Sequence, residues 1–296
     1  MTAEARPAPA LSGLRHFLPV SVPQGPLDYG RRLWMRVLLA SVFLFLYAPI
    51  AVLIAFSFND SKRNIVWQGF TLKYYAVAWN NADLFDAMTN SLIIAAVSTL
   101  FATVIGAMVG LQLWRFRFPF KGAYEGFMAL PIVIPEITMG VALMAFFFKL
   151  GWMTTDFGWP FNLFPIIIAH IAFCFPFVAI VVRSRMVGFN MQLEEASKDL
   201  GASQWQTFRH VLLPFMKPGL IAGSLLAFTL SLDDFVITYF TSGPGSVTFP
   251  VKVFSMVRRG VTPDINAAST VLIVITVVAT VLAMKMQAPD KTGKGQ

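Results

Sequence analysis

The sequence is poor in charged residues, histidine and cysteine. Only 13% of its 296 residues are Asp, Glu, Lys or Arg, about half the share that soluble domains carry. Cys174 is the one cysteine, which excludes an intrachain disulfide and argues against a thiolate metal cluster. No G-x-x-x-x-G-K-[ST] phosphate loop occurs, so we expect no ATP and no other cofactor to bind this chain itself.

The chain is rich in apolar residues. They make up 56% of the chain, and the mean hydropathy is +0.67, which indicates a protein embedded in membrane lipid. The net charge of +8 could suggest a nucleic-acid partner. We reject that interpretation, because the basic residues lie at the edges of apolar runs, where they orient membrane proteins.

Six segments are apolar and long enough to cross a bilayer, which takes roughly 20 residues. They cover residues 34–58, 88–112, 126–149, 164–182, 218–240 and 265–286. The fourth contains His170, which we expect to be packed and hydrogen-bonded. The fifth reaches full length only if Asp233 and Asp234 lie at membrane depth. The sequence therefore predicts an all-α integral membrane protein with six transmembrane helices.

Lysine and arginine positions predict the orientation. With the N-terminus inside, about sixteen of the 23 basic residues fall on the cytoplasmic side. Residues 1–33 are expected to be a disordered cytoplasmic tail, 34–286 a transmembrane domain, and 287–296 a second cytoplasmic tail. The polar insert at about 190–217 then faces the cytoplasm, and both chain termini lie there too.

The insert has the pattern of two short helices joined by a turn. Gly201 suits a left-handed turn, and Ser203 can cap the second helix. Each helix carries an apolar stripe with i, i+3 and i+7 spacing: Leu193, Ala196 and Leu200, then Trp205, Phe208 and Leu212. Pro214 and Pro218 are expected to end the second helix. The balanced charge favours docking into a protein groove over binding to anionic lipid.

The same insert resembles the signature of ABC importer permeases. That signature reads Glu-Ala-Ala, three residues, Gly, nine residues, Ile, one residue, Leu-Pro. This chain has Glu195-Ala196-Ser197, Gly201, Val211 and Leu213-Pro214 at matching positions. The departures, Ser for Ala and Val for Ile, are small.

The resemblance implies a type I ABC importer permease fold and a set of partners. The insert would be a coupling helix in the cleft of a separate ATPase subunit, two of which bind ATP and Mg and drive the pore. A homologous second permease subunit and a periplasmic binding protein would complete a transporter in the bacterial inner membrane. The coupling residues implied are Glu194, Glu195, Ala196, Gly201, Leu213 and Pro214.

Four further stretches are similar to the second permease subunit of spermidine/putrescine transporters. They are SFND (57–60), LPIVIPEI (130–137), SLDDFVITYFTSGPG (231–245) and VFSMVRRGVTPDINA (253–267). This resemblance implies that the cargo is a polyamine. Ionisable groups at membrane depth are costly and usually functional, and here Glu136, Asp233 and Asp234 are all acidic, as a path for a polycation requires.

The remaining candidates carry open alternatives. Phe235, Tyr239 and Trp152 could offer cation–π faces along the path. Glu136 could instead bond backbone groups freed by Pro135. Asp233 and Asp234 point about 100° apart on a helix, so both cannot face one point of a pore.

Lys252, Arg258 and Arg259 lie in the predicted outer loop 241–262, where they could dock an acidic binding protein or be ordinary loop charges. The alternative functions are an ABC permease for another solute (another amine, an opine or ferric iron) and, from a different class, an ion-coupled secondary carrier. A sulfate carrier is disfavoured, because anion paths present cations or helix N-termini to the substrate.

Overall fold

The computed structural model describes residues 33–61, 66–153, 158–258 and 262–287. Its helices are α1 (Leu33–Phe56), α2 (Lys73–Asn80), α3 (Ala82–Arg115), α4 (Lys121–Val133), α5 (Glu136–Lys149), η2 (Phe161–Leu163), α6 (Phe164–Met186), α7 (Met191–Asp199), α8 (Gln204–Thr207), η3 (Phe208–Leu212), α9 (Leu213–Asp233), α10 (Val236–Thr241), α11 (Phe249–Val257) and α12 (Pro263–Gln287). Across those four ranges the one extended pairing is an isolated bridge between Asn59 and Phe70.

The helices account for the six predicted spans. Five are long and apolar enough to cross a membrane: α1, α3, η2 with α6, the continuous helix from Gln204 to Asp233, and α12. The sixth is the pair α4 and α5, which is bent by 101° at a short break. The predicted all-α membrane fold is confirmed, with the correction that the third span is broken and the fifth is interrupted at Asp234.

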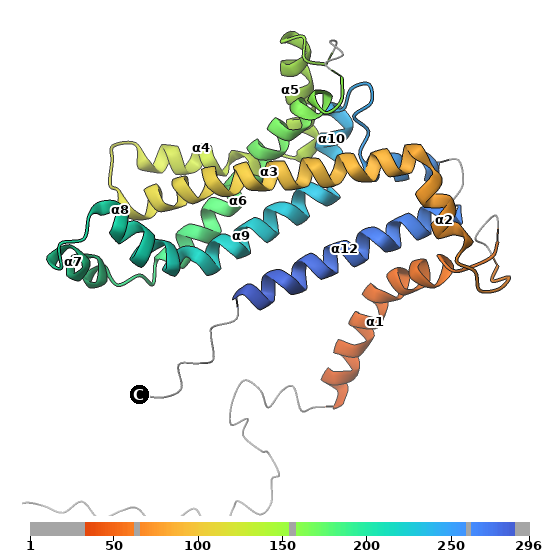
Figure 1. Cartoon of the computed structure of the whole chain (residues 1–296), viewed down its shortest axis with the longest axis horizontal. Helices are drawn as coiled ribbons and strands as arrows, with labels where there is room; N and C mark the ends of the chain where they lie inside the picture. Colours follow the sequence, from red (N-terminus) through yellow and green to blue (C-terminus); the bar gives the residue numbers. More distant parts are fainter. Residues whose placement is uncertain (1–32, 62–65, 154–157, 259–261, 288–296) are drawn as a thin grey trace, which may run out of the picture. The chain divides into compact units, whose positions relative to one another are not determined.

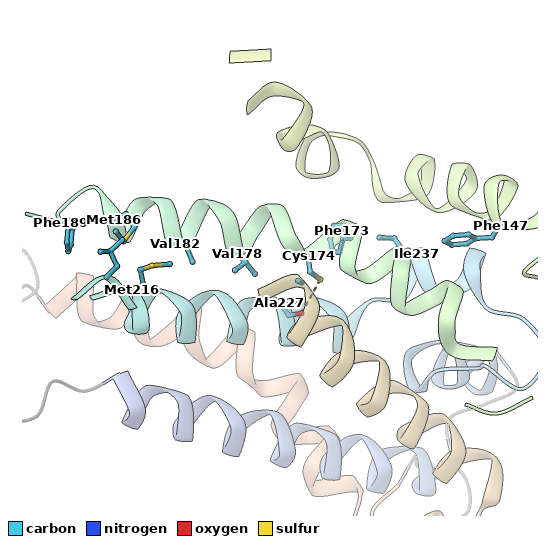
Figure 2. Packing of buried hydrophobic residues seen from close by; sticks show 13 residues of the cluster. Phe147, Phe173, Cys174, Val178, Val182, Met186, Phe189, Met216, Ala227 and Ile237 are labelled. Carbon is cyan, nitrogen blue, oxygen red and sulfur yellow. Dashed lines mark hydrogen bonds between the residues drawn. The ribbon is translucent and has the colours of Figure 1, made fainter. Parts of the chain in front are cut away.

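The chain divides into two compact units at Leu53 and Ile54, so α1, which lies mostly in the first, is considered by itself. In the second unit, α3, α6 and α9 pack against one another. Figure 2 shows their shared core, which runs from Phe189 and Met216 at one end to Phe147 at the other. Glycine allows the close approach, because a Cβ at Gly106 of α3 would lie 2.6 Å from the Cβ of Val178.

The second unit has two ends that matter for function. Helices α7 and α8 lie at one end of the α3–α6–α9 bundle, and α10 lies toward the other (Figure 1). The long helix α3 connects these ends, since Arg115 at its last turn contacts α7 while its first turns meet the loop after α10. The predicted tails 1–33 and 287–296 lie outside the described residues, apart from Leu33 and Gln287.

Candidate functional site

The polar insert folds as two helices around a left-handed turn, as its sequence predicts. Helix α7 ends at Asp199, and Gly201 follows with φ +79°. The amides of Gly201 and Ala202 donate to the carbonyls of Lys198 and Ser197 at 2.8 and 3.1 Å, which is a Schellman motif. Ser203 then caps α8 in a capping box with Gln206. The two predicted helices and their turn are therefore confirmed.

Beyond α8 the structure corrects one expectation. Pro214 and Pro218 do not end the second helix, because α8, η3 and α9 run on without a break to Asp233. The segment η3 is a turn of π-helix, in which the amide of Leu213 donates to the carbonyl of Phe208. The wider turn lies directly before Pro214, where a proline without an N–H interrupts the ordinary α-helical pattern. The insert is thus joined rigidly to a membrane span.

The two adjacent glutamates of α7 have opposite surroundings. The carboxylate of Glu194 accepts two hydrogen bonds from the Arg115 guanidinium at 2.6 and 2.7 Å and one from Lys198 at 2.8 Å. Only 4% of Glu194 is exposed. Arg115, and to a lesser extent Lys198, lowers the pKa of Glu194 to about 2, against the opposing effect of burial. Glu195 lies on the outer surface of the insert.

The outer surface of the insert presents large apolar side chains among polar ones. Leu193, Leu200 and Trp205 are each more than half exposed, and the Trp205 ring stacks on Phe208 with centroids 5.6 Å apart. Of the other predicted coupling residues, Ala196, Gly201, Leu213 and Pro214 are exposed as well. Exposed apolar groups on a short rigid helix pair are typical of a protein-docking surface.

Two breaks in membrane helices form the second candidate region. Helix α4 ends at Val133, and Ile134 and Pro135 are extended before α5 begins at Glu136. Glu136 is exposed in the first turn of α5. Helix α5 packs against α10, and its Gly140 lies so close to Phe240 that a Cβ there would be 2.8 Å from the ring. The break between α4 and α5 is thereby held beside the second break, which lies between α9 and α10.

At the second break, Asp234 is a structural residue. Its carboxylate accepts hydrogen bonds from the amides of Ile237 and Thr238 and from the Thr238 hydroxyl, at 2.8 to 3.3 Å. Asp234 therefore caps α10 where α9 has ended. His170 Nε2 lies 3.3 Å from the same carboxylate. With 9% of the residue exposed, Asp234 is directed toward the bundle and away from solvent.

His170 extends this cap into a buried hydrogen-bond network. Its Nε2 lies 2.9 Å from Thr238 Oγ1, its Nδ1 lies 2.7 Å from Ser231 Oγ, and Ser231 lies 2.9 Å from Ser98 Oγ. The network joins α3, α6, α9 and α10, and each side chain in it is almost fully buried. The prediction that His170 is packed and hydrogen-bonded is confirmed.

Asp233 lies on the exposed side of the same break. It is near enough to Glu136 for the two charges to interact, and Phe235 follows it two residues later in the chain. The Phe235 ring lies 5.5 Å from that of Tyr239, whose side chain is about half exposed. The structure thus brings together Glu136, Asp233, Phe235 and Tyr239, and it separates Asp233 from Asp234, as their helical spacing predicts.

The other predicted residues lie elsewhere. Trp152 packs between Phe147 and Phe164 just beyond the far end of α5. That end of the helix is about 20 Å from Glu136 by the rise per residue. Lys252 forms an ion pair with Asp83 at 2.6 Å. The guanidinium of Arg258 lies 4.5 Å from the centroid of the Phe254 ring, and Arg259 lies outside the described residues.

Sequence reasoning missed two features of these sites. Arg115, one of the basic residues at the edges of the apolar runs, is also the main partner of Glu194. Ser98, Ser231 and Thr238 were not singled out, although they complete the network around His170. Small hydroxyl residues inside apolar spans were the available signal, because they commonly bond to polar groups on neighbouring helices.

Comparison with known proteins gives the family. Residues 102–288 match the family described as binding-protein-dependent transport system inner membrane component. The chain belongs to this family. It is 40% identical over 254 residues to the spermidine/putrescine transport system permease protein PotC of Escherichia coli (strain K12), covering 86% of this chain and 93% of that protein. It is also 40% identical over 243 residues to the putrescine transport system permease protein PotI of that strain, covering 81% and 85%.

Solved structures confirm the fold. A bacterial ABC transporter involved in the import of the acidic polysaccharide alginate matches with a TM-score of 0.68 at 16% identity, over 88% of this chain and 96% of that one. The MetNI methionine ABC transporter matches with a TM-score of 0.52 at 21% identity, over 68% and 93%. The chain is therefore a multi-span, non-catalytic permease component of an ABC importer.

Proposed function

We propose that this permease passes polyamines such as putrescine and spermidine across the bacterial inner membrane. The observation that carries the proposal is the pair of exposed carboxylates, Glu136 and Asp233, at two adjoining helix breaks. Helices broken at mid-membrane are typical of substrate sites in transporters. Two acids there suit a cargo with several positive charges, and the relatives named for spermidine and putrescine support the same class.

The aromatic neighbours favour an organic amine among the possible cations. Phe235 and Tyr239 can offer ring faces to an alkylammonium group. A ferric ion would instead require more oxygen or nitrogen ligands. An opine remains an alternative, because it also carries an amine. An ion-coupled carrier is set aside, since the chain belongs to a binding-protein-dependent family.

The energy for transport would come from ATPase subunits docked on α7 and α8. The exposed Leu193, Leu200 and Trp205 would enter the groove of an ATPase, with Glu195 beside them. ATP and Mg would bind to that partner, since this sequence lacks a phosphate loop. Glu194 has another role in this scheme, because its bonds to Arg115 fix α7 against α3. Movement of the ATPases would then reach α3 through Glu194 and α9 through the π turn.

The other partners follow from the proposed orientation. With α7 and α8 in the cytoplasm, both termini are cytoplasmic, and α11 with its flanking loops faces the periplasm. Lys252 is held by Asp83, so Arg258 and Arg259 remain the better candidates for docking a periplasmic binding protein. A homologous second permease subunit would complete the pore.

Uptake measurements test the cargo path. Putrescine uptake into proteoliposomes that contain the whole transporter is expected to fall about tenfold in Glu136→Gln and in Asp233→Asn, the usual cost of losing a charged hydrogen-bond partner. Asp60→Asn removes another exposed acid and is the control, expected to leave uptake unchanged. Unaltered uptake in both path variants would remove these residues from the path.

Co-purification tests the docking surface. Glu195→Lys is expected to reduce recovery of the ATPase subunits with the tagged permease, because it reverses a charge in the proposed contact. Asp60→Lys makes the same charge change elsewhere and should retain them. Full recovery with Glu195→Lys and with Trp205→Ala would contradict docking at this surface.

A further inference from the structure

A cavity of about 590 Å³ lies at the opposite end of α3 from the coupling insert. Its wall includes Phe85, Asp86 and Asn90 of α3, Trp159 and Asn162 from the start of the fourth span, and the turn at Pro244 and Gly245. Asn90 and Arg115 are 25 residues apart on one helix, or about 38 Å by helical rise. The cavity volume falls in the usual range for small-molecule sites.

The wall of the cavity is fixed by hydrogen bonds. Asn90 is 3% exposed, and its Nδ2 donates to the carbonyls of Gly245 and Val247 at 3.3 and 3.1 Å. Its Oδ1 accepts from the Trp159 indole N–H at 3.2 Å. One buried amide thus holds both the loop after α10 and the Trp159 ring in place. The position of the Trp159 ring at the cavity is therefore fixed by Asn90, whose side-chain amide already has its hydrogen-bond partners.

A second amide in the wall has an unused acceptor. Asn162 Nδ2 donates to the carbonyl of Pro244 at 3.2 Å. This bond fixes the orientation of the amide, because the opposite orientation would place two oxygens against each other. Asn162 Oδ1 is then a buried acceptor, with no hydrogen-bond partner in the part of the chain that the structure describes. The bond between Asn162 and Pro244 holds the turn at Gly245 against the start of the fourth span.

The described part of the cavity wall carries negative charge and no positive charge. Among the described wall residues, Asp86 is the only charged one, and none is Lys, Arg or His. Asp86 is exposed, and within the described ranges no hydrogen bond or ion pair involves its carboxylate. Phe85 and Trp159 are 42% and 61% exposed. The cavity therefore combines an exposed carboxylate with two exposed aromatic rings.

We infer that this cavity is a binding site for an organic ammonium ion, such as one end of a linear diamine. An ammonium group supplies only donors and a positive charge, which match the acceptor oxygens and negative charge of the Asp86 carboxylate. Its alkyl chain and charge would lie against Phe85 and Trp159, the usual surroundings of bound alkylammonium groups. The site lies outside the helix breaks, separate from Glu136 and Asp233, and would hold an amine before it enters the path.

The test measures binding without transport. The purified transporter, in nanodiscs without ATP or binding protein, is titrated with radiolabelled putrescine in equilibrium dialysis. The background carries Glu136→Gln and Asp233→Asn, which remove the proposed site at the helix breaks. Putrescine is expected to bind still, and butane-1,4-diol, which has the same length but no charge, is expected not to compete.

Substitutions of the cavity residues then test whether putrescine binds at this site. Asp86→Asn should weaken putrescine binding about tenfold and Trp159→Leu a few fold. Asp86→Glu should leave binding nearly unchanged, and so should Asp199→Asn in α7, at the other end of α3. Absence of putrescine binding in the background variant, or equal binding in Asp86→Asn, would overturn the inference. Because uptake is not the readout, a failure here is distinguishable from a failure of the proposed transport function.

Discussion

The coupling insert and the second helix break each contain two adjacent acidic residues, and the structure uses the two pairs in the same way. In Glu194–Glu195 the first acid is buried against Arg115 and the second is exposed. In Asp233–Asp234 the second is buried against His170 and the first is exposed. Neighbours on a helix point about 100° apart, so one acid of each pair stabilises the fold while the other is free to meet a partner.

This comparison separates two kinds of mutational effect. Loss of a buried acid removes hydrogen bonds inside the chain and leaves its former partners unsatisfied, which lowers stability. Loss of an exposed acid removes little from the fold, so its effect should appear only in transport or in subunit binding. In each pair, substitution of the exposed acid is therefore a control for the stability loss expected from substitution of the buried acid.

The largest effect is expected at Asp234. Asp234→Ala removes the cap of α10 and the carboxylate beside His170, and should destabilise the protein by about 3 kcal/mol. Asp233→Ala should change stability by less than about 0.5 kcal/mol, as usual for an exposed side chain. Thermal unfolding of the two variants in nanodiscs measures the difference. Equal stabilities would mean that the cap is not important to the fold.

The next effect concerns the attachment of α7. Glu194→Ala leaves Arg115 and Lys198 without their carboxylate and should cost about 2 kcal/mol, between the values for exposed and buried ion pairs. ATPase subunits should still bind, because Leu193, Glu195 and Trp205 are untouched, but less putrescine should be carried per ATP hydrolysed.

A double-mutant cycle tests whether Arg115 is the partner through which Glu194 acts. If Arg115 acts through Glu194, the Arg115→Ala/Glu194→Ala variant should be little worse than either single variant. Uptake per ATP and thermal stability are both measured, with Asp199→Ala, at another exposed acid of α7, as the matched control. Additive losses would show that the two residues act independently.

The same ion cluster predicts a dependence on pH. The pKa of Glu194 is lowered from its ordinary value of 4.5 to about 2, chiefly by Arg115. A lowered pKa in the folded state means that the unfolded chain binds more protons, so the stabilisation is complete above pH 4.5 and is lost as the pH falls toward 2. Thermal unfolding from pH 5 to pH 2.5 should lose this contribution in the wild type. Glu194→Gln should lack it, and identical pH profiles would contradict the assignment.

Local signals in the sequence predicted much of the fold. The apolar runs gave the six spans, and Gly201 with Ser203 gave the turn of the insert. The Ile134-Pro135 pair could also have indicated the break before α5, because a residue that precedes proline is usually extended. These features depend on neighbours in the chain, which is why a single sequence reveals them.

Contacts between distant residues could not be read in this way. No glycine or proline marks the break at Asp234, which is held by His170, 64 residues earlier in the chain. Glu194 meets Arg115 across 79 residues. Which acid of each pair is buried depends on these partners, so the sequence alone could not separate the structural acid from the free one.

The smallest effect is expected in the turn between α7 and α8. Gly201 has φ +79°, and no atom would obstruct a Cβ there, so Gly201→Ala should cost only the strain of a left-handed backbone, about 1 kcal/mol. Gly188 also has open space around it but no left-handed φ, and Gly188→Ala should be nearly neutral. Hydrogen exchange of the α7 amides in nanodiscs should be about fivefold faster in Gly201→Ala, because the turn fixes the end of that helix. Equal exchange in the two variants would mean that the turn contributes nothing to holding α7 or to the docking surface.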